Sequence, residues 1–198
     1  QYDGDTPAPG MDRFYGRPGQ VPLREPSPPM QSDADIRFAG LYQDVINQFA
    51  VGDNPRYTPY IPNPDNTYCN TFAGDVARAM DVPFPTKAEF GVRTGDQATI
   101  GSPDLWKYFT DSTANVKASD AGWREISQTD LTTLQDHVNS GKMAVVVTSG
   151  HIAVVTPGQE ISSFQGIEIA QAGATCSNDL TVERGFGKNT TAKIFIID

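Results

Sequence analysis

Cys69 is one of two cysteines in the 198 residues, and it lies where a polar loop gives way to an apolar-periodic segment. In CNTFAGDVARAM, which begins at Cys69, apolar residues recur three and four positions apart, a spacing that predicts a helix with one buried stripe. The N–H groups and the dipole at the start of a helix stabilise a thiolate, and the same N–H groups can hold an oxyanion. Cys69 is therefore a candidate nucleophile for acyl transfer.

A thiolate nucleophile needs a positioned base, which is most often a histidine, and the chain contains two histidines. His137 falls on a predicted helix beside the stripe residue Val138, and we interpret it as a solvated or half-buried helix residue. His151 opens the β-branched run HIAVVT directly after Gly150. A histidine at the start of a strand lies at the rim of the sheet and can face a helix terminus, so His151 is the candidate base.

Gln171 lies inside the otherwise apolar run IEIAQAGA. A buried amide needs a hydrogen-bond partner, and orienting the imidazole of His151 would supply one. Each signal also has a structural reading: cysteine is among the most buried residue types, and a lone histidine or glutamine in a strand is often incidental. Along the chain, Cys69 comes at a helix start, His151 at a strand start and Gln171 in the next strand. This order favours a catalytic triad of the three residues.

The segments TYCNTFAGDVARAM, GHIAVVTPG and IAQAGA resemble those of NlpC- and CHAP-type cysteine amidohydrolases. These papain-like enzymes cut peptide or amide bonds in bacterial peptidoglycan. The resemblance covers roughly residues 63–198, and it implies that Cys69 is the nucleophile, His151 the base and Gln171 the orienting residue. It also implies that VERGFG and AKIFIID belong to the closing strands of such a domain.

Two features depart from that pattern. The contexts DCSG and QCTWY, which are common around the nucleophile in these enzymes, are absent, because the chain reads YCNT. The stretch from Pro83 to Trp123 reads as an insertion between the helix and His151. The bond that is cut therefore does not follow from these segments.

Polar neighbours of Cys69 are candidates for an oxyanion donor or a substrate contact, namely Asn66, Tyr68 and Asn70, although Asn66 fits a helix cap equally well. Aromatic residues could line a groove for sugar or peptide, but they are as often core residues. They are Tyr57, Tyr60, Trp106 and Trp123. From both sets we expect Tyr68, Asn70 and Trp106 to bind substrate.

Helices and strands must position these residues. Their sequence patterns predict an α+β domain over residues 32–198, with N-terminal helices packed on an antiparallel sheet. Helical spacing occurs over residues 32–49, with Ser32 or Asp33 as N-cap, and again over 69–80, 102–109 and 128–142. Strand patterns occur over 122–126, 143–148, 151–156, 167–173 and 192–198. Residues 1–31 hold seven of the fifteen prolines, which predicts an extended arm.

The formal charge of −9 argues against a nucleic-acid surface and against docking on anionic lipid. The apolar runs are too short to cross a bilayer. No His/Cys spacing indicates a zinc site, and we expect no cofactor. The chain begins at Gln1 without Met, which is typical of a processed or trimmed form. We expect a monomer that is secreted or delivered to the cell wall or periplasm.

Cys176, the second cysteine, is predicted to lie on the loop that leaves the strand of Gln171. Two cysteines in an extracellular protein would most simply be paired, and a bond to Cys69 would mask the nucleophile. Because the nucleophile must be a thiolate, we expect both cysteines to be free in the active form.

The function that the resemblance implies is cleavage of amide bonds in peptidoglycan through a thioester, as a cysteine amidase or endopeptidase. Such an enzyme would serve wall remodelling, phage lysis or antimicrobial attack, with peptidoglycan or its stem peptides as the partner. One alternative is a papain-like enzyme that modifies proteins, as a peptidase, deamidase or transglutaminase. The other is a non-catalytic binding module of the same fold.

Overall fold

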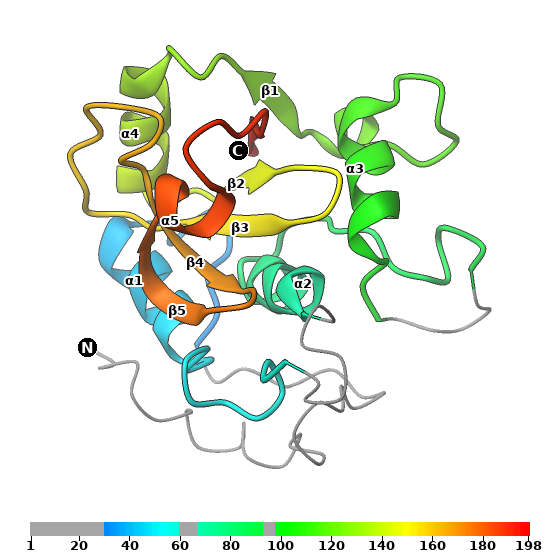
Figure 1. The fold of residues 1–198 in the computed structure, drawn as a ribbon, viewed down its shortest axis with the longest axis horizontal. Coiled ribbons are helices and arrows are strands. Elements are labelled where there is room, and N and C mark those ends of the chain that lie inside the picture. Colours follow the sequence, from blue (N-terminus) through cyan, green and yellow to red (C-terminus); the bar gives the residue numbers. More distant parts are fainter. Residues whose placement is uncertain (1–29, 60–66, 93–97) are drawn as a thin grey trace.

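The computed structural model describes residues 30–59, 67–92 and 98–198. Within these ranges, six strands form one antiparallel sheet in the order β1-β6-β2-β3-β4-β5 (Figure 1). The strands are β1 (Arg124–Ile126), β2 (Ala144–Val147), β3 (Ile152–Val155), β4 (Glu168–Ala172), β5 (Cys176–Thr181) and β6 (Lys193–Ile196). The helices are α1 (Ala39–Asn47), α2 (Cys69–Ala79), α3 (Ser102–Thr110), η2 (Ala118–Ala121), α4 (Leu131–Asn139) and α5 (Val182–Phe186). The predicted α+β class with an antiparallel sheet is confirmed.

The centre of the sheet is a fully buried pair of hairpin strands. β2 (AVVV) and β3 (IAVV) are buried at every position, which fits runs of β-branched residues without polar alternation. Helix α2 packs on β3 and β4, and α4 packs on β2. Tyr42 ties α1 to the same core, because its buried hydroxyl donates a hydrogen bond of 3.0 Å to the carbonyl of Val155. The predicted packing of early helices on the sheet is confirmed.

Helix α1 begins later than predicted. It starts at Ala39 after Phe38, and neither Ser32 nor Asp33 caps it. The N–H of Ser32 donates to the carbonyl of Ala79 at the end of α2, and the carboxylate of Asp33 accepts from the N–H of Asp35 in a local turn. The polar residues that resemble helix caps therefore stabilise a turn, and the predicted N-cap is wrong.

Two other predictions near the end of the chain are wrong. Cys176 begins strand β5, which pairs with β4, so it does not lie on a loop. The sequence of β5, CSNDLT, is polar because it forms an edge of the sheet, and it lacks the apolar pattern that marks a strand. VERGFG forms the short helix α5, whose first turn is capped by the hydroxyl of Thr181, so it is not a closing strand.

His137 is buried, which corrects its interpretation as a solvated or half-buried residue. Its Nε2 donates to the carbonyl of Met143 at 3.1 Å, across the turn that follows α4. The turn contains Gly141 with φ of +85°, a left-handed conformation that glycine commonly adopts just after a helix. His137 thus lies in the core and joins α4 to the residue just before β2.

The insertion-like stretch from Pro83 to Trp123 carries α3 and η2 and forms a lobe beside the sheet (Figure 1). An aromatic cluster joins this lobe to β6: the ring of Phe109 lies 5.3 Å from that of Trp123 and 4.7 Å from that of Phe195. Trp123 is 3% exposed, and its indole N–H donates to the carbonyl of Pro83 at 2.9 Å. Trp123 is therefore a core residue, the second of the two roles that its sequence left open.

A network of buried charged and polar side chains surrounds Asp75 of α2. Asp75, on α2, accepts from Arg56 Nε at 2.7 Å and from the hydroxyl of Tyr57 at 2.6 Å. The Arg56 and Asp75 side chains are each 1% exposed. Tyr57 is fully buried in this network, so it does not line a groove either.

Among the described residues, no helix is long and apolar enough to cross a membrane.

Candidate active site

Cys69 is the first residue of α2, as predicted, and its side chain is 1% exposed. The helix start is docked on the sheet, because the N–H of Tyr68 donates to the carbonyl of Ala172 at the end of β4. Tyr68 makes no side-chain cap hydrogen bond to the first turn of α2. The thiol thus lies at the positive end of a helix dipole, where an anion is stabilised.

His151 immediately precedes β3, which begins at Ile152, one residue later than the predicted strand start at His151. The turn from β2 holds its backbone, because the N–H of Thr148 donates to the carbonyl of His151 at 2.8 Å. Its ring packs against that of Phe186 from α5, with the centroids 4.7 Å apart. Backbone and ring are therefore both fixed at the rim of the sheet, as the sequence predicted.

Gln171 determines which nitrogen of His151 faces the thiol. Its Oε1 lies 2.7 Å from His151 Nε2, and its Nε2 donates to the carbonyl of Thr175 at 3.1 Å. The second bond fixes the amide orientation, so Oε1 must accept a hydrogen bond from the N–H at His151 Nε2. The other ring nitrogen, Nδ1, is then the one that bonds Cys69. The structure thus brings the three predicted residues together in one chain of hydrogen bonds.

Two glycines let the backbone approach this pair closely. A Cβ on Gly185 of α5 would lie 2.6 Å from Gln171 Oε1, and one on Gly173 would lie 3.1 Å from His151 Cε1. Any side chain at Gly185 would displace the oxygen that holds the imidazole. Helix α5 and the β4–β5 turn therefore pack directly against the base and its orienting residue.

The electrostatics of the site favour a thiolate–imidazolium pair. Burial by itself raises the pKa of the Cys69 thiol, but the hydrogen bond and charge of His151, with smaller effects of Ser102 and Ile152, outweigh it and lower the pKa from 9.0 to about 7. For His151, burial lowers the pKa, and the hydrogen bond and charge of Cys69 raise it above its ordinary value. Each partner therefore stabilises the ionised form of the other.

Ser102 is the functional residue that sequence reasoning missed. Its hydroxyl lies 3.3 Å from the sulfur of Cys69, although the two residues are 33 positions apart. Ser102 is the first residue of α3, in the insertion-like stretch. Because a thiolate can only accept, the hydroxyl is the donor once Cys69 is ionised. A serine after a glycine at a predicted helix start was visible in the sequence, but nothing there related it to Cys69.

The lowered pKa gives a testable pH dependence. Because the reactive thiolate is present above about pH 7 and is lost below it, the rate of Cys69 alkylation by iodoacetamide should rise with a midpoint near 7, well below 9.0. His151→Ala should raise this midpoint, since burial is then opposed only by the smaller effects of Ser102 and Ile152. Ser102→Ala should raise it less and slow alkylation at pH 7 about three- to tenfold, the effect of one hydrogen bond.

Mass spectrometry of the Cys69 peptide measures the rate at each pH, so that Cys176 does not contribute. Ser102→Thr is the matched control, because it keeps the hydroxyl and should restore the wild-type profile. An unchanged midpoint in Ser102→Ala would show that the hydroxyl does not act on the thiolate.

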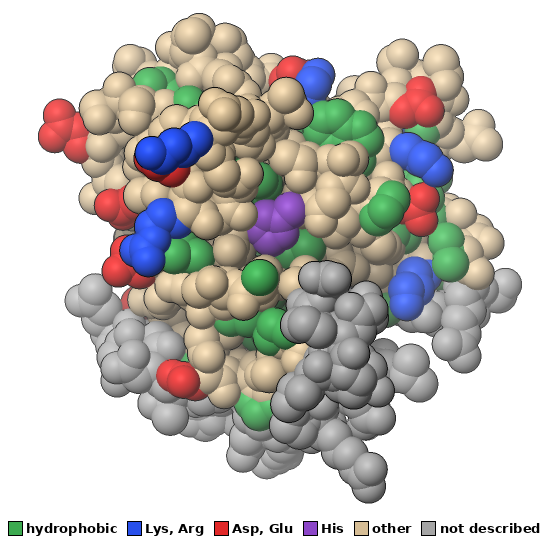
Figure 2. Space-filling model, in the orientation of Figure 1, with side chains coloured by type: hydrophobic (Ala, Val, Ile, Leu, Met, Phe, Trp, Pro, Cys, Tyr) green, Lys and Arg blue, Asp and Glu red, His purple; other side chains and the backbone are tan. Residues whose placement is uncertain are grey.

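Two pockets lie beside the residues that contact Cys69, namely Ser102 and His151, and share Thr67 and Gly150 in their walls. The larger, of about 550 Å³, is lined by residues of α2 and α3, including Tyr68, Asn70 and Ser102. The smaller, of about 320 Å³, is lined by His151, Gln171 and parts of the β4–β5 turn and α5. We call them the α2-side pocket and the His-side pocket. In Figure 2 a histidine lies near the middle of this face, with uncharged surface around it.

The predicted substrate-binding residues divide between these pockets and other places. Tyr68 and Asn70 line the α2-side pocket, and Asn70 also donates to the carbonyl of Ile100 at 2.9 Å, which holds the segment before α3. Trp106 lines neither pocket and is partly buried against the core. The predictions for Tyr60 and Asn66, like that of the arm up to residue 29, lie outside the described residues.

Cys176 is a free thiol, and so is Cys69, which confirms the prediction that the two are not paired. The Cys176 thiol donates to the carbonyl of Tyr57 at 3.3 Å. Burial, with a smaller contribution from the negative charge of Cys69, raises the pKa of Cys176 to about 11. Cys176 therefore stays protonated at neutral pH and is no nucleophile.

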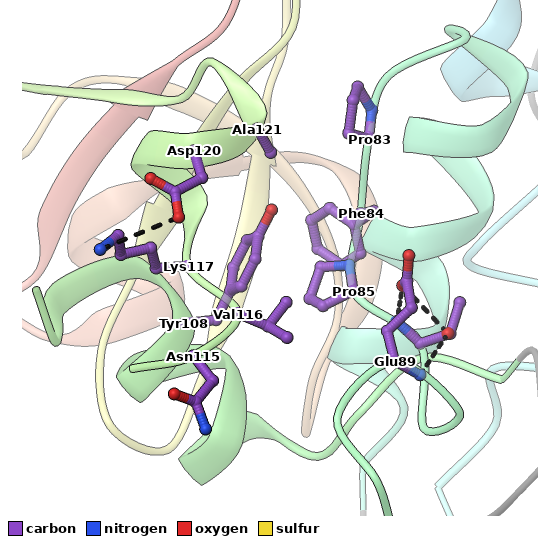
Figure 3. Close-up of a pocket in the computed structure, with 11 residues that line it drawn as sticks. Pro83, Phe84, Pro85, Glu89, Tyr108, Asn115, Val116, Lys117, Asp120 and Ala121 are labelled. Carbon is purple, nitrogen blue, oxygen red and sulfur yellow. Dashed lines mark hydrogen bonds and ion pairs between the residues drawn. The ribbon is translucent and has the colours of Figure 1, made fainter. Parts of the chain in front are cut away.

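A third pocket, of about 390 Å³, lies between α3, η2 and the segment before α3 (Figure 3). Its apolar wall includes Phe84 and Tyr108, and its charged residues are Glu89 and the ion pair Lys117–Asp120. It shares no lining residue with the His-side pocket. Of the three pockets, only the α2-side pocket and the His-side pocket therefore lie next to the candidate nucleophile and its base.

No protein-family model matches this chain, and a search of the curated proteins finds no match to it.

Proposed function

We propose that this protein is a papain-like cysteine amidohydrolase of the NlpC/CHAP type, which cuts amide bonds in bacterial peptidoglycan. The observation that carries the proposal is the chain Cys69–His151–Gln171: a thiol at a helix start with its pKa lowered to about 7, bonded to an imidazole whose other nitrogen is held at 2.7 Å by an amide oxygen. A cysteine with a purely structural role needs neither a histidine that a second side chain holds in place nor a lowered pKa.

The residues support an acyl-transfer mechanism with two steps. The Cys69 thiolate attacks the carbonyl carbon, and the N–H groups at the start of α2 stabilise the oxyanion. His151, as the imidazolium, protonates the leaving amine from Nδ1, which gives a thioester and a free amine. The neutral imidazole then takes a proton from water, the hydroxide attacks the thioester, and the acid leaves as the Cys69 thiolate is restored.

The two pockets fit a polymeric substrate. They share Thr67 and Gly150 in their walls and so lie next to each other, which leaves room for a chain on both sides of the scissile bond. An extended peptide or a peptide joined to sugar needs such a through-going site, whereas a small amide needs one pocket. Together with the segments that resemble the NlpC and CHAP enzymes, this favours peptidoglycan at the cell wall or in the periplasm.

Digestion of purified peptidoglycan tests the proposal. We expect the full chain to release fragments with new amino groups from at least one of several wall types, because a carboxylate and an amine form with each cut. Liquid chromatography with mass spectrometry identifies the bond: free stem peptides indicate an amidase, and shortened stems an endopeptidase. The matched control is Cys69→Ala, which should leave every muropeptide intact.

Intact muropeptides from all wall types after incubation with the wild-type chain would overturn the assignment of the substrate. New termini or deamidated glutamines in protein substrates would then favour a protein-modifying enzyme. A Cys69 that reacts with iodoacetamide no faster than an ordinary thiol would indicate a binding module.

A further inference from the structure

The two pockets receive different parts of the substrate. His151 must protonate the leaving amine, so the part of the substrate that follows the scissile bond lies beside this ring. That space is the His-side pocket, lined by His151 and Gln171. The acyl part, which stays on Cys69, then occupies the α2-side pocket, which Ser102 borders. This assignment rests on the proposed acyl transfer.

Arg184 is the one charged residue among the described residues that line the His-side pocket. It belongs to α5, whose backbone is fixed because the N–H of Arg184 donates to the hydroxyl of Thr181. The neighbouring carboxylate of Glu183 pairs with Lys188 at 3.3 Å. The guanidinium therefore provides a positive charge and several donors at the edge of the pocket.

The described walls of the two pockets hold no carboxylate, although the whole chain carries a formal charge of −9. None of the described residues that line the His-side pocket or the α2-side pocket is Asp or Glu, whereas the third pocket has Glu89 and Asp120. Besides Arg184 and the His151 imidazole, the polar side chains in the described wall of the His-side pocket are uncharged, and Thr67 and Thr175 each offer a hydroxyl. In an acidic protein, a pocket whose described wall holds a basic residue and no carboxylate favours an anionic ligand.

We propose that Arg184 binds a free carboxylate on the residue that follows the scissile bond. The substrate is then a peptide in which the leaving amine belongs to an amino acid with an unblocked carboxylate. Guanidinium–carboxylate pairs are bidentate and discriminate strongly against a neutral amide. In peptidoglycan this selects a bond within the stem peptide, because the first stem residue, whose nitrogen joins the sugar, has its carboxylate in a peptide bond.

A pair of alkylating reagents tests the charge at the site without a substrate. N-iodoacetylglycine and N-iodoacetylglycinamide differ only in a terminal carboxylate or carboxamide. We expect the full chain to react faster at Cys69 with the acid than with the amide. In Arg184→Ala the ratio of the two rate constants should fall about fivefold, the size of one partly exposed ion pair, and Arg184→Lys should keep most of it.

Lys107→Ala is the matched control, since this lysine of α3 is 64% exposed and lines neither pocket. It removes the same charge and should leave the ratio unchanged. An equal ratio in wild type and Arg184→Ala, or an equal fall in Lys107→Ala, would overturn the carboxylate site.

Peptide substrates extend the test to turnover. Stem peptides whose leaving residue carries a carboxylate should be cut with a higher kcat/KM than the same peptides amidated at that position, and Arg184→Ala should lose the acid form's advantage while it cuts the amide as before. Equal rates on both forms in wild type would overturn the proposal while the amidohydrolase function stands. If neither peptide is cut, the proposed function fails, and the reagent ratio still decides whether Arg184 recognises an anion.

Discussion

Replacement of Cys69 by alanine is expected to lower turnover by about 10⁴- to 10⁶-fold, the loss typical of a missing covalent nucleophile. His151→Ala should have an effect of similar size, because the thiolate loses its partner and the leaving amine its proton donor. Gln171→Ala should cost less, since an orienting amide is partly replaceable by water. Release of amino groups from peptidoglycan, or from a stem peptide, measures each rate.

The folded state provides the control for these variants. Cys69→Ala and His151→Ala should keep the circular dichroism spectrum of the wild type, because neither side chain holds the sheet together. Cys176→Ala removes the other thiol and should keep nearly full activity, since the pKa of about 11 leaves Cys176 protonated. Wild-type turnover in Cys69→Ala would rule out the thioester mechanism.

Replacement of Asp75 by alanine is expected to lower the free energy of unfolding by about 3–5 kcal/mol, because it leaves the guanidinium of Arg56 buried without its carboxylate. Both side chains are 1% exposed, so water cannot replace the lost partner. The hydroxyl of Tyr57 also loses its acceptor, which lies 2.6 Å away. Urea denaturation, followed by tryptophan fluorescence, measures the change.

A surface ion pair is the matched control for Asp75. Lys193 and Glu125 lie 2.9 Å apart on neighbouring strands, but they are 39% and 48% exposed, so Glu125→Ala should cost less than about 1 kcal/mol. The double variant Arg56→Met, Asp75→Leu should recover much of the stability, because it removes both buried charges and fills their volume. A loss of less than about 1 kcal/mol in Asp75→Ala would show that the network contributes little.

The sequence by itself determined the elements that carry the proposed triad. The apolar spacing after Cys69 predicted α2 with its correct first residue, and the β-branched runs predicted the strands around His151 and Gln171. Such patterns are readable because the side-chain period of a helix or strand follows directly from backbone geometry. They fail where residues are polar for another reason: the N–H of Ser32 bonds the end of α2, Asp33 stabilises a turn, and β5 is an edge strand with a polar sequence.

Tertiary structure alone decided the contacts that tune the site. Ser102 lies 3.3 Å from the sulfur of Cys69 because α3 packs on α2, and Arg184 lines the pocket beside His151 because α5 packs on β4 and β5. The choice of Nδ1 as the nitrogen that faces the thiol depends on where the Gln171 amide lies. These pairs are far apart in the chain, and sequence periodicity carries no information on which helix end meets which strand end. Packing of the whole core sets those distances, and with them the ionisation of the nucleophile.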